Sequence, residues 1–139
     1  MHVTIDGFGG NPAQLGNLEL VRNLLDRYPD EIGMTKITEP HCFEYRGEKP
    51  GDWGVSGFVI IAESHIAIHT FPEHQQVWVD VFSCKGFDET PAIDMIVEAF
   101  SLESTRVCKL ERGLEYPHNV ERSIPLNRIE RRAVSPVGV

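Results

Sequence analysis

Three strand-like segments follow one another in the middle of the chain with only short breaks between them. Residues 55–62 and 65–71 are strongly apolar, and Val77, Val79 and Val81 recur at every second position. β-Branched residues and two-residue alternation are typical of strands that pack one face on a core. The centre of the chain therefore predicts three consecutive strands.

Two helices and further strands flank this centre. Apolar residues recur at helical spacing over residues 15–28, which Pro29 is expected to end, and again over residues 88–102. Further strands are expected at residues 2–8, 34–45 and 105–111. Two helices are too few for an alternating parallel fold. The prediction is an α+β fold, a two-layer sandwich with a mainly antiparallel sheet and helices on one face.

The length of 139 residues fits one compact domain, expected at residues 1–118, followed by a polar tail at 119–139. A formal net charge of -8 argues against a nucleic-acid surface, because phosphate binding needs concentrated positive charge. The longest apolar stretch, near residues 57–62, is far shorter than a membrane span, and the N-terminus lacks a secretory pattern. We therefore expect no membrane partner and a cytoplasmic protein.

The three cysteines, Cys42, Cys84 and Cys108, are odd in number and show no Cys-x-x-Cys spacing. This pattern argues against a disulfide framework and a structural zinc site. No metal site is predicted.

The residue types that could carry chemistry gather around Ser64. Ser64 follows Glu63 and precedes His65, while His69 and Cys84 lie further along. From the residues alone, a serine with a histidine base and a Cys84–His69 thiol pair both stay open. A serine beside a histidine in a strand is most often structural, so neither pairing decides the function.

Four motifs in residues 55–84 match a known family in order and spacing. They are Val-Ser-Gly at 55–57, Glu-Ser-His at 63–65, Ile-His-Thr-Phe-Pro-Glu at 68–73 and Asp-Val-Phe-Ser-Cys at 80–84. This segment resembles the core of the small prokaryotic S-adenosylmethionine decarboxylases. The likeness is weaker outside it, although the order of strands and helices agrees.

The resemblance implies a proenzyme that cuts itself between Glu63 and Ser64. The products would be a β chain of residues 1–63 and an α chain beginning at residue 64. Ser64 would become a covalent pyruvoyl group, the cofactor that forms a Schiff base with the amino group of the substrate.

The same resemblance implies roles for three further residues. His69 is the expected base in the elimination step, which releases the Glu63 carboxylate from the ester, since histidine exchanges protons near neutral pH. Ser56 is expected to assist processing through a hydrogen bond. Cys84 is the expected proton donor to the carbanion that decarboxylation leaves.

Substrate-binding candidates are Phe43, Phe71 and Glu73. Aromatic faces suit an adenine ring and a sulfonium cation, and Phe43 resembles the stacking position of the family. Phe71 departs from the family, where a tryptophan is common before Pro-Glu. The leading substrate is S-adenosylmethionine, for spermidine and polyamine synthesis.

The sequence also leaves other functions open. Residues 46–53 look longer than the corresponding loop of the family, and Glu44, Glu48 and Asp52 could bind the cationic side chain of arginine or ornithine instead. A non-catalytic, uncut relative that regulates a partner is a further alternative, disfavoured by the intact motifs. A homodimer of cleaved units is expected, because members of the family pair their sandwiches.

Overall fold

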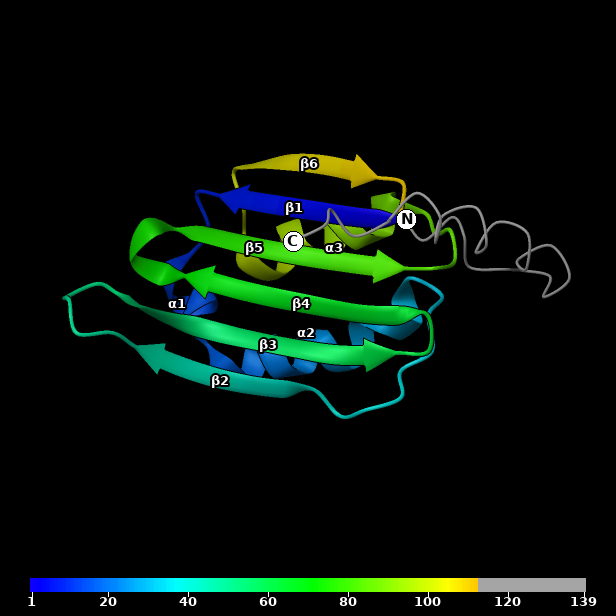
Figure 1. Ribbon diagram of the computed structural model, residues 1–139. Helices are drawn as coiled ribbons and strands as arrows, with labels where there is room; N and C mark the ends of the chain where they lie inside the picture. Colours follow the sequence, from blue (N-terminus) through cyan, green and yellow to red (C-terminus); the bar gives the residue numbers. More distant parts are fainter. Residues whose placement is uncertain (113–139) are drawn as a thin grey trace, which may run out of the picture.

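Six strands form one antiparallel sheet in the computed structural model, which describes residues 1–112. They are β1 (His2–Phe8), β2 (His41–Arg46), β3 (Trp53–Ile61), β4 (Ser64–Phe71), β5 (Gln76–Ser83) and β6 (Ser104–Leu110). Their order across the sheet is β2-β3-β4-β5-β1-β6 (Figure 1). The three central segments predicted from the sequence are β3, β4 and β5, and each pairs antiparallel with the next.

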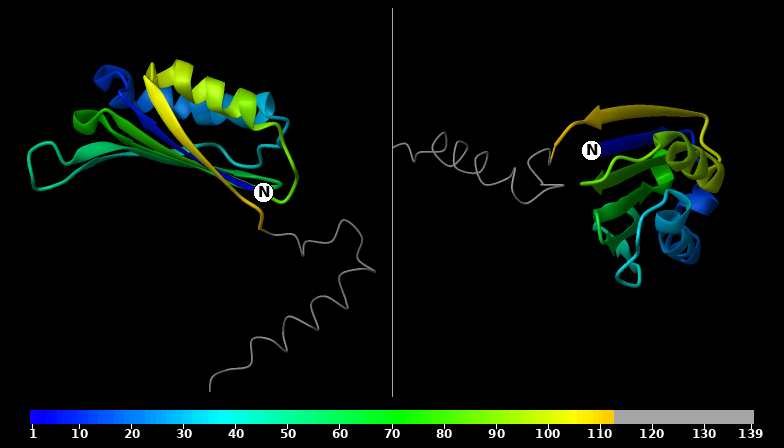
Figure 2. Two further views of the ribbon diagram at one scale, coloured as in Figure 1. Left: turned by 90° about the horizontal axis from the view of Figure 1, so that it is seen from above. Right: turned by 90° about the vertical axis from the view of Figure 1, so that its right-hand side faces the viewer.

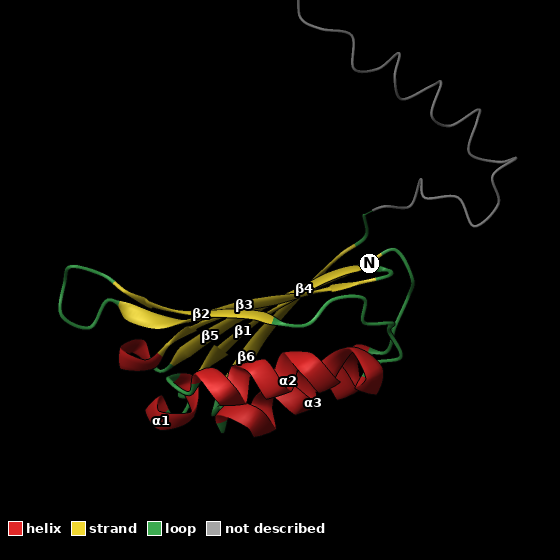
Figure 3. Ribbon diagram, turned by 90° about the horizontal axis from the view of Figure 1, so that it is seen from below, coloured by secondary structure: helices red, strands yellow, loops and turns green. Residues whose placement is uncertain are grey.

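The α-helices lie on one face of this sheet (Figure 3). They are α1 (Pro12–Leu15), α2 (Leu18–Glu31) and α3 (Glu89–Phe100), and a short 3-10 helix, η1 (Pro72–His74), connects β4 to β5. The view from above in Figure 2 shows the same two layers, with the β2–β3 hairpin reaching beyond the rest of the sheet. The predicted two-layer α+β sandwich is confirmed.

Both long helices begin at capping side chains. The Oδ1 atom of Asn17 accepts a hydrogen bond from the amide of Leu20 at 3.0 Å, and Oδ1 of Asp88 accepts one from Thr90 at 2.9 Å. These caps satisfy amides that have no partner within the helix.

The predicted end of the first long helix at Pro29 is wrong, because α2 continues through Pro29 to Glu31. A proline so close to the end of a helix removes only one hydrogen bond. The carbonyl of Pro29 also accepts hydrogen bonds from the amides of Ile32 and Met34, at 3.2 and 2.8 Å, so the chain is held where the helix ends.

The hydrophobic core lies between the sheet and the helices. In β5, Val77, Val79 and Val81 are buried, while the residues between them point to the other face of the sheet. Burial of such a side chain stabilises the fold by about 1.5–3 kcal/mol. Tyr28 of α2 is fully buried, and its hydroxyl donates to the carbonyl of Ala92 at 2.7 Å, which joins α2 to α3.

The predicted strand at residues 34–45 is only partly present, since β2 begins at His41. Pro40 has no amide hydrogen for a strand ladder. Before it, Lys36 makes one isolated bridge to Ile61. Residues 34–40 are therefore a connection that runs beside the end of β3.

No helix within residues 1–112 is both long and apolar enough to cross a membrane. The predicted domain boundary at residue 118 and the tail at 119–139 lie outside the described residues, and both stay predictions.

Candidate active site

Glu63 and Ser64 lie at the tight turn that joins β3 to β4. Residues 62 and 63 form the turn, and Ile61 pairs with Ser64 across it. Two apolar strands on either side fix the register, because a slip by one residue would expose their buried faces. The peptide bond between Glu63 and Ser64 therefore lies at one end of the strands, where the chain reverses.

Cys84 reaches this turn from the neighbouring strand. β5 ends at Ser83, which pairs with Ser64, and the next amide, that of Cys84, donates a hydrogen bond to the carbonyl oxygen of Glu63 at 3.0 Å. An amide in this position polarises the carbonyl and stabilises an oxyanion that forms on it. Three predicted site residues, Glu63, Ser64 and Cys84, are thus brought together.

His65 is the histidine near the hydroxyl of Ser64, with 3.4 Å between Oγ of Ser64 and Nδ1 of His65. The ring of His65 contacts the ring of Phe82, with centroids 5.8 Å apart. Beside Phe82, Nε2 of His2 lies 3.0 Å from Oδ1 of Asp80. His2 and Asp80 were not among the residues predicted for the site, because only the pairing of β1 with β5 makes them neighbours.

Ser56 and His69 form a second group, away from Ser64. They face each other across β3 and β4, and Oγ of Ser56 lies 2.9 Å from Nδ1 of His69. His69 is five residues beyond Ser64 on the same strand, which corresponds to about 16 Å. Within one chain, the predicted base and the predicted pyruvoyl residue are therefore far apart.

The Ser56–His69 pair belongs to a row of side chains that crosses the sheet. The pairing registers place Phe43 beside Ser56, and Trp78 beside His69. Phe43 is 62% exposed, so its ring is available to a ligand or to another protein surface.

The other two predicted substrate residues lie at the same end of the sheet. The ring of Phe71 packs against that of Trp78, with centroids 4.3 Å apart. Glu73 accepts a hydrogen bond from Nε1 of Trp53 at 3.2 Å. Phe43, Phe71 and Glu73 thus accompany His69, and not Ser64.

The sheet face opposite the helices carries several exposed large apolar side chains and, within the described residues, no other element covers it (Figure 3). We call it the open face; its exposed large apolar side chains include Phe43, Tyr45, Phe58 and Trp78. Exposed apolar patches of this kind mark sites of protein association or ligand binding.

The β2–β3 loop borders a shallow cavity of about 310 Å³ lined by residues 46–53. Arg46 pairs with the carboxylate of Glu44 at 2.6 Å and lies over the ring of Trp53 at 4.8 Å. Glu44 is therefore already paired, which weakens the case for it as a partner of a cationic substrate.

The remaining cysteines show no sign of a site. Burial raises the pKa of the Cys42 thiol, and Cys108 is exposed. Among residues 1–112, no three histidine, cysteine or acidic side chains are grouped so that they could hold a metal ion.

Comparison with known proteins identifies a family for this chain. The family described as S-adenosylmethionine decarboxylase matches residues 1–113. The S-adenosylmethionine decarboxylase proenzyme of Thermococcus kodakarensis is 33% identical over 116 residues, which cover 82% of this chain and 76% of that protein. The proenzyme of the same name from a Hydrogenobaculum species is 35% identical over 117 residues, covering 82% and 81%.

The fold points to the same group. A crystal structure of the adenosylmethionine decarboxylase from Aquifex aeolicus aligns with a TM-score of 0.68 at 30% identity, covering 81% of this chain and 89% of that one. The family match spans the sheet, both long helices and the turn at Glu63 and Ser64. The chain therefore belongs to the S-adenosylmethionine decarboxylase family.

Proposed function

We propose that this chain is the proenzyme of a pyruvoyl-dependent decarboxylase, which cuts itself before Ser64 and acts on S-adenosylmethionine. The observation that carries the proposal is the hydrogen bond from the Cys84 amide to the carbonyl of Glu63, the carbonyl that self-cleavage must activate. The relatives named as proenzymes of S-adenosylmethionine decarboxylase support the substrate.

Self-cleavage begins when Oγ of Ser64 attacks the carbonyl carbon of Glu63. The C–N bond breaks, which leaves an ester to Oγ and a free amino group on residue 64. Loss of the Cα proton of residue 64 then expels the Glu63 carboxylate and leaves dehydroalanine. Water adds to its imine form, and ammonia leaves as the pyruvoyl group is formed. The Cys84 amide stabilises the oxyanion of the first step.

The surroundings of residue 64 fit a pyruvoyl group. Pairing between Ser64 and Ser83 fixes the backbone, and the half-buried Cys84 is the next residue of the neighbouring strand. A pyruvoyl carbonyl withdraws electrons from the bond that releases carbon dioxide, as pyridoxal phosphate does elsewhere. Cys84 then supplies the proton that replaces the carboxylate, while Phe43 and Glu73 hold the rest of the substrate.

A second copy of the chain completes the site. Ser64 and His69 lie at equal distances from the point of β4 between Ile66 and Ala67. We place a two-fold axis between two stacked sheets, parallel to both, so that it passes over β4 at that point and at right angles to the strand. This axis puts Ser64 of one copy over His69 of the partner subunit. Stacked sheets are about 10 Å apart, a gap that side chains fill.

The open face supplies the surface for this pairing. Its exposed aromatic residues, Phe43, Phe58 and Trp78, surround the Ser56–His69 pair. Burying them between two copies removes apolar area from water and brings Phe43 and His69 to the pyruvoyl end of the partner subunit.

Two inactive variants test the shared site. When Ser64→Ala and His69→Ala chains are expressed together, a mixed dimer has one site with both groups, in which the His69→Ala chain supplies Ser64. We expect that chain to be cut in the mixture and to stay uncut alone. Cleavage of His69→Ala alone would contradict the role of His69, and no cleavage in the mixture would contradict the shared site.

The direct test of self-processing is the intact mass of the purified protein beside Ser64→Ala. We expect two fragments that divide before residue 64, the second carrying the pyruvoyl mass, and one uncut chain for the variant. A natural chain that stays uncut overturns the proposal in favour of a regulatory relative.

The substrate is tested by release of carbon dioxide from S-adenosylmethionine, arginine and ornithine by the cut protein. We expect release from S-adenosylmethionine. Release from arginine or ornithine instead would move the substrate to a basic amino acid and leave self-cleavage intact.

A further inference from the structure

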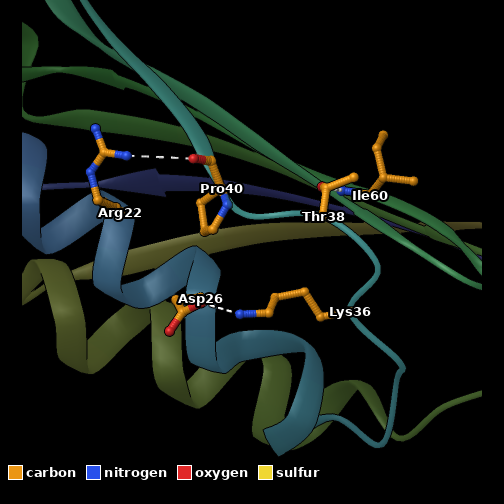
Figure 4. A network of polar contacts seen from close by, with 6 residues as sticks. All are labelled: Arg22, Asp26, Lys36, Thr38, Pro40 and Ile60. Atoms are coloured by element: carbon orange, nitrogen blue, oxygen red, sulfur yellow. Dashed lines mark hydrogen bonds and ion pairs between the residues drawn. The ribbon is translucent and has the colours of Figure 1, made fainter.

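The connecting segment at residues 34–40 is anchored to α2 by side chains (Figure 4). The ammonium of Lys36 pairs with the carboxylate of Asp26. Nη1 of Arg22 donates to the carbonyl of Pro40 at 3.5 Å. The segment thus has a fixed path between the helix layer and the edge of β3.

We call residues 35–38 the strap, because they bind the end of β3 and the turn that follows it. Hydrogen bonds of 2.8 to 3.1 Å run from Ala62 N to Thr35 O, from Ile37 N to Ile60 O, and from Ile60 N to Oγ1 of Thr38. The last of these is visible in Figure 4. A turn of two residues is thereby held along one side by a neighbouring piece of chain.

The strap also contacts the residue whose carbonyl is attacked. The amide of Thr35 donates to Oε2 of Glu63 at 3.1 Å. The amide of Cys84 donates to the carbonyl oxygen of the same residue at 3.0 Å. Glu63 is therefore held through its side chain and through its backbone by two different segments.

These two segments are joined to each other. Nζ of Lys85 donates to the carbonyl of Gly33 at 3.1 Å, and Oγ of Ser83 lies 3.6 Å from Sδ of the buried Met34. The approach to the strap and the residues around Cys84 thus form one connected frame around the turn.

We propose that the strap positions the carbonyl of Glu63 for attack by Ser64, so that it controls the rate of self-cleavage and not the rate of decarboxylation. This inference rests on the proposed function. Attack requires reacting atoms about 3–3.5 Å apart, and a misplacement of about 1 Å can slow a reaction by about 10²-fold. Once the Glu63–Ser64 bond is broken, this alignment is no longer needed.

Thr38→Val and Thr38→Ser form the matched pair that tests the strap. Valine has the shape of threonine but leaves the Ile60 amide without its acceptor, whereas serine keeps the hydroxyl. We expect self-cleavage of the freshly translated full chain, followed by intact mass, to be at least about tenfold slower in Thr38→Val and near the natural rate in Thr38→Ser. After complete cleavage, Thr38→Val should match the natural protein in kcat/KM.

Glu63→Ala and Glu63→Gln test the contact with Thr35, and they keep the inference open to contradiction even where Thr38→Val does not fold. Glutamine retains a carbonyl oxygen that can accept from the Thr35 amide, and alanine does not. We expect Glu63→Ala to cleave at least about tenfold more slowly than Glu63→Gln.

The outcomes separate the two proposals. If the natural chain never cuts itself, both the proposed function and the proposed role of the strap are contradicted. If the natural chain is cut and Thr38→Val and Glu63→Ala are cleaved at the same rate as the natural chain, the proposed role of the strap is contradicted and the proposed function is not. Equal losses of cleavage rate and of mature kcat/KM in Thr38→Val also overturn it, because they indicate a general structural effect.

Discussion

The amide nitrogen of Cys84 lies 3.0 Å from the carbonyl oxygen of Glu63. In the proposed function, one residue thus presents a backbone donor to the bond that is cut and a thiol to the decarboxylation site. Substitution can separate these two contributions. Cys84→Pro removes the donor and the thiol together, and Cys84→Ala removes the thiol only.

We expect self-cleavage to slow by about 10²–10³-fold in Cys84→Pro, the usual loss when one oxyanion donor is removed. Cys84→Ala should cleave near the natural rate and lose about 10²-fold or more in decarboxylation, since it lacks the thiol proposed as the proton donor. Time courses of intact mass and of carbon dioxide release check both. Normal cleavage in a folded Cys84→Pro chain would contradict the role of the amide.

Charge on the open face should prevent association. Phe58→Lys places an ammonium among exposed aromatic residues, where pairing with a second copy would bury it without a partner. We expect a monomer in sedimentation velocity and no self-cleavage. Val107→Lys is the control, because Val107 is also exposed but lies on the helix-covered side, paired with the buried Ile5. A monomeric natural protein would contradict the shared site.

Tyr28 makes stability depend on pH in the alkaline range. Burial raises the pKa of Tyr28 above its ordinary value, whereas in the unfolded chain a tyrosine ionises near pH ~10. The contribution of Tyr28 to the free energy of unfolding is therefore complete below pH ~10. It is lost as the pH rises above that value, because the tyrosine hydroxyl loses its proton in the unfolded chain first.

Tyr28→Phe should destabilise the fold by about 1 kcal/mol at pH 8, since the hydrogen bond from the Tyr28 hydroxyl to the carbonyl of Ala92 is lost. Urea unfolding at pH 8 and pH 10.5 should show a smaller difference between the variant and the natural protein at the higher pH. An equal difference at both values would show that Tyr28 does not ionise in the unfolded chain as expected.

Gly54 is required because a side chain at this position would collide with the neighbouring strand. A Cβ atom there would overlap the backbone carbonyl of Thr70, which cannot move without breaking the pairing of β3 with β4. We expect Gly54→Ala to cost more than about 2 kcal/mol in thermal unfolding. Gly86→Ala, which meets open space, is the control and should change stability little.

The periodicity of the sequence predicted most of the sheet correctly. Alternating or strongly apolar runs became β1, β3, β4 and β5, because one face of each packs on the helices. The errors occur where local rules compete. Pro29 lies so close to the end of α2 that its missing donor hardly matters, and residues 34–40 bind the end of β3 without forming a regular strand.

The sequence predicted those contacts of the candidate site that arise from the pairing of strands adjacent in the chain. Ser64 and Cys84 meet because β4 and β5 form a hairpin-like pair, which their spacing suggests. The distance between Ser64 and His69 also follows from strand geometry, although motif matching treats them as one group. The contacts of Thr35 and Thr38 could not be predicted, because hydrogen bonds of an irregular segment leave no periodic signal in the sequence.

The strand order makes the two products of cleavage interleave. A cut before Ser64 leaves β1, β2 and β3 on one fragment and β4, β5 and β6 on the other, yet β1 lies between β5 and β6. The fragments cannot separate without breaking the β3–β4, β1–β5 and β1–β6 pairings. The cut protein should therefore stay whole without a covalent link, and its unfolding midpoint should rise with protein concentration, as for a heterodimer.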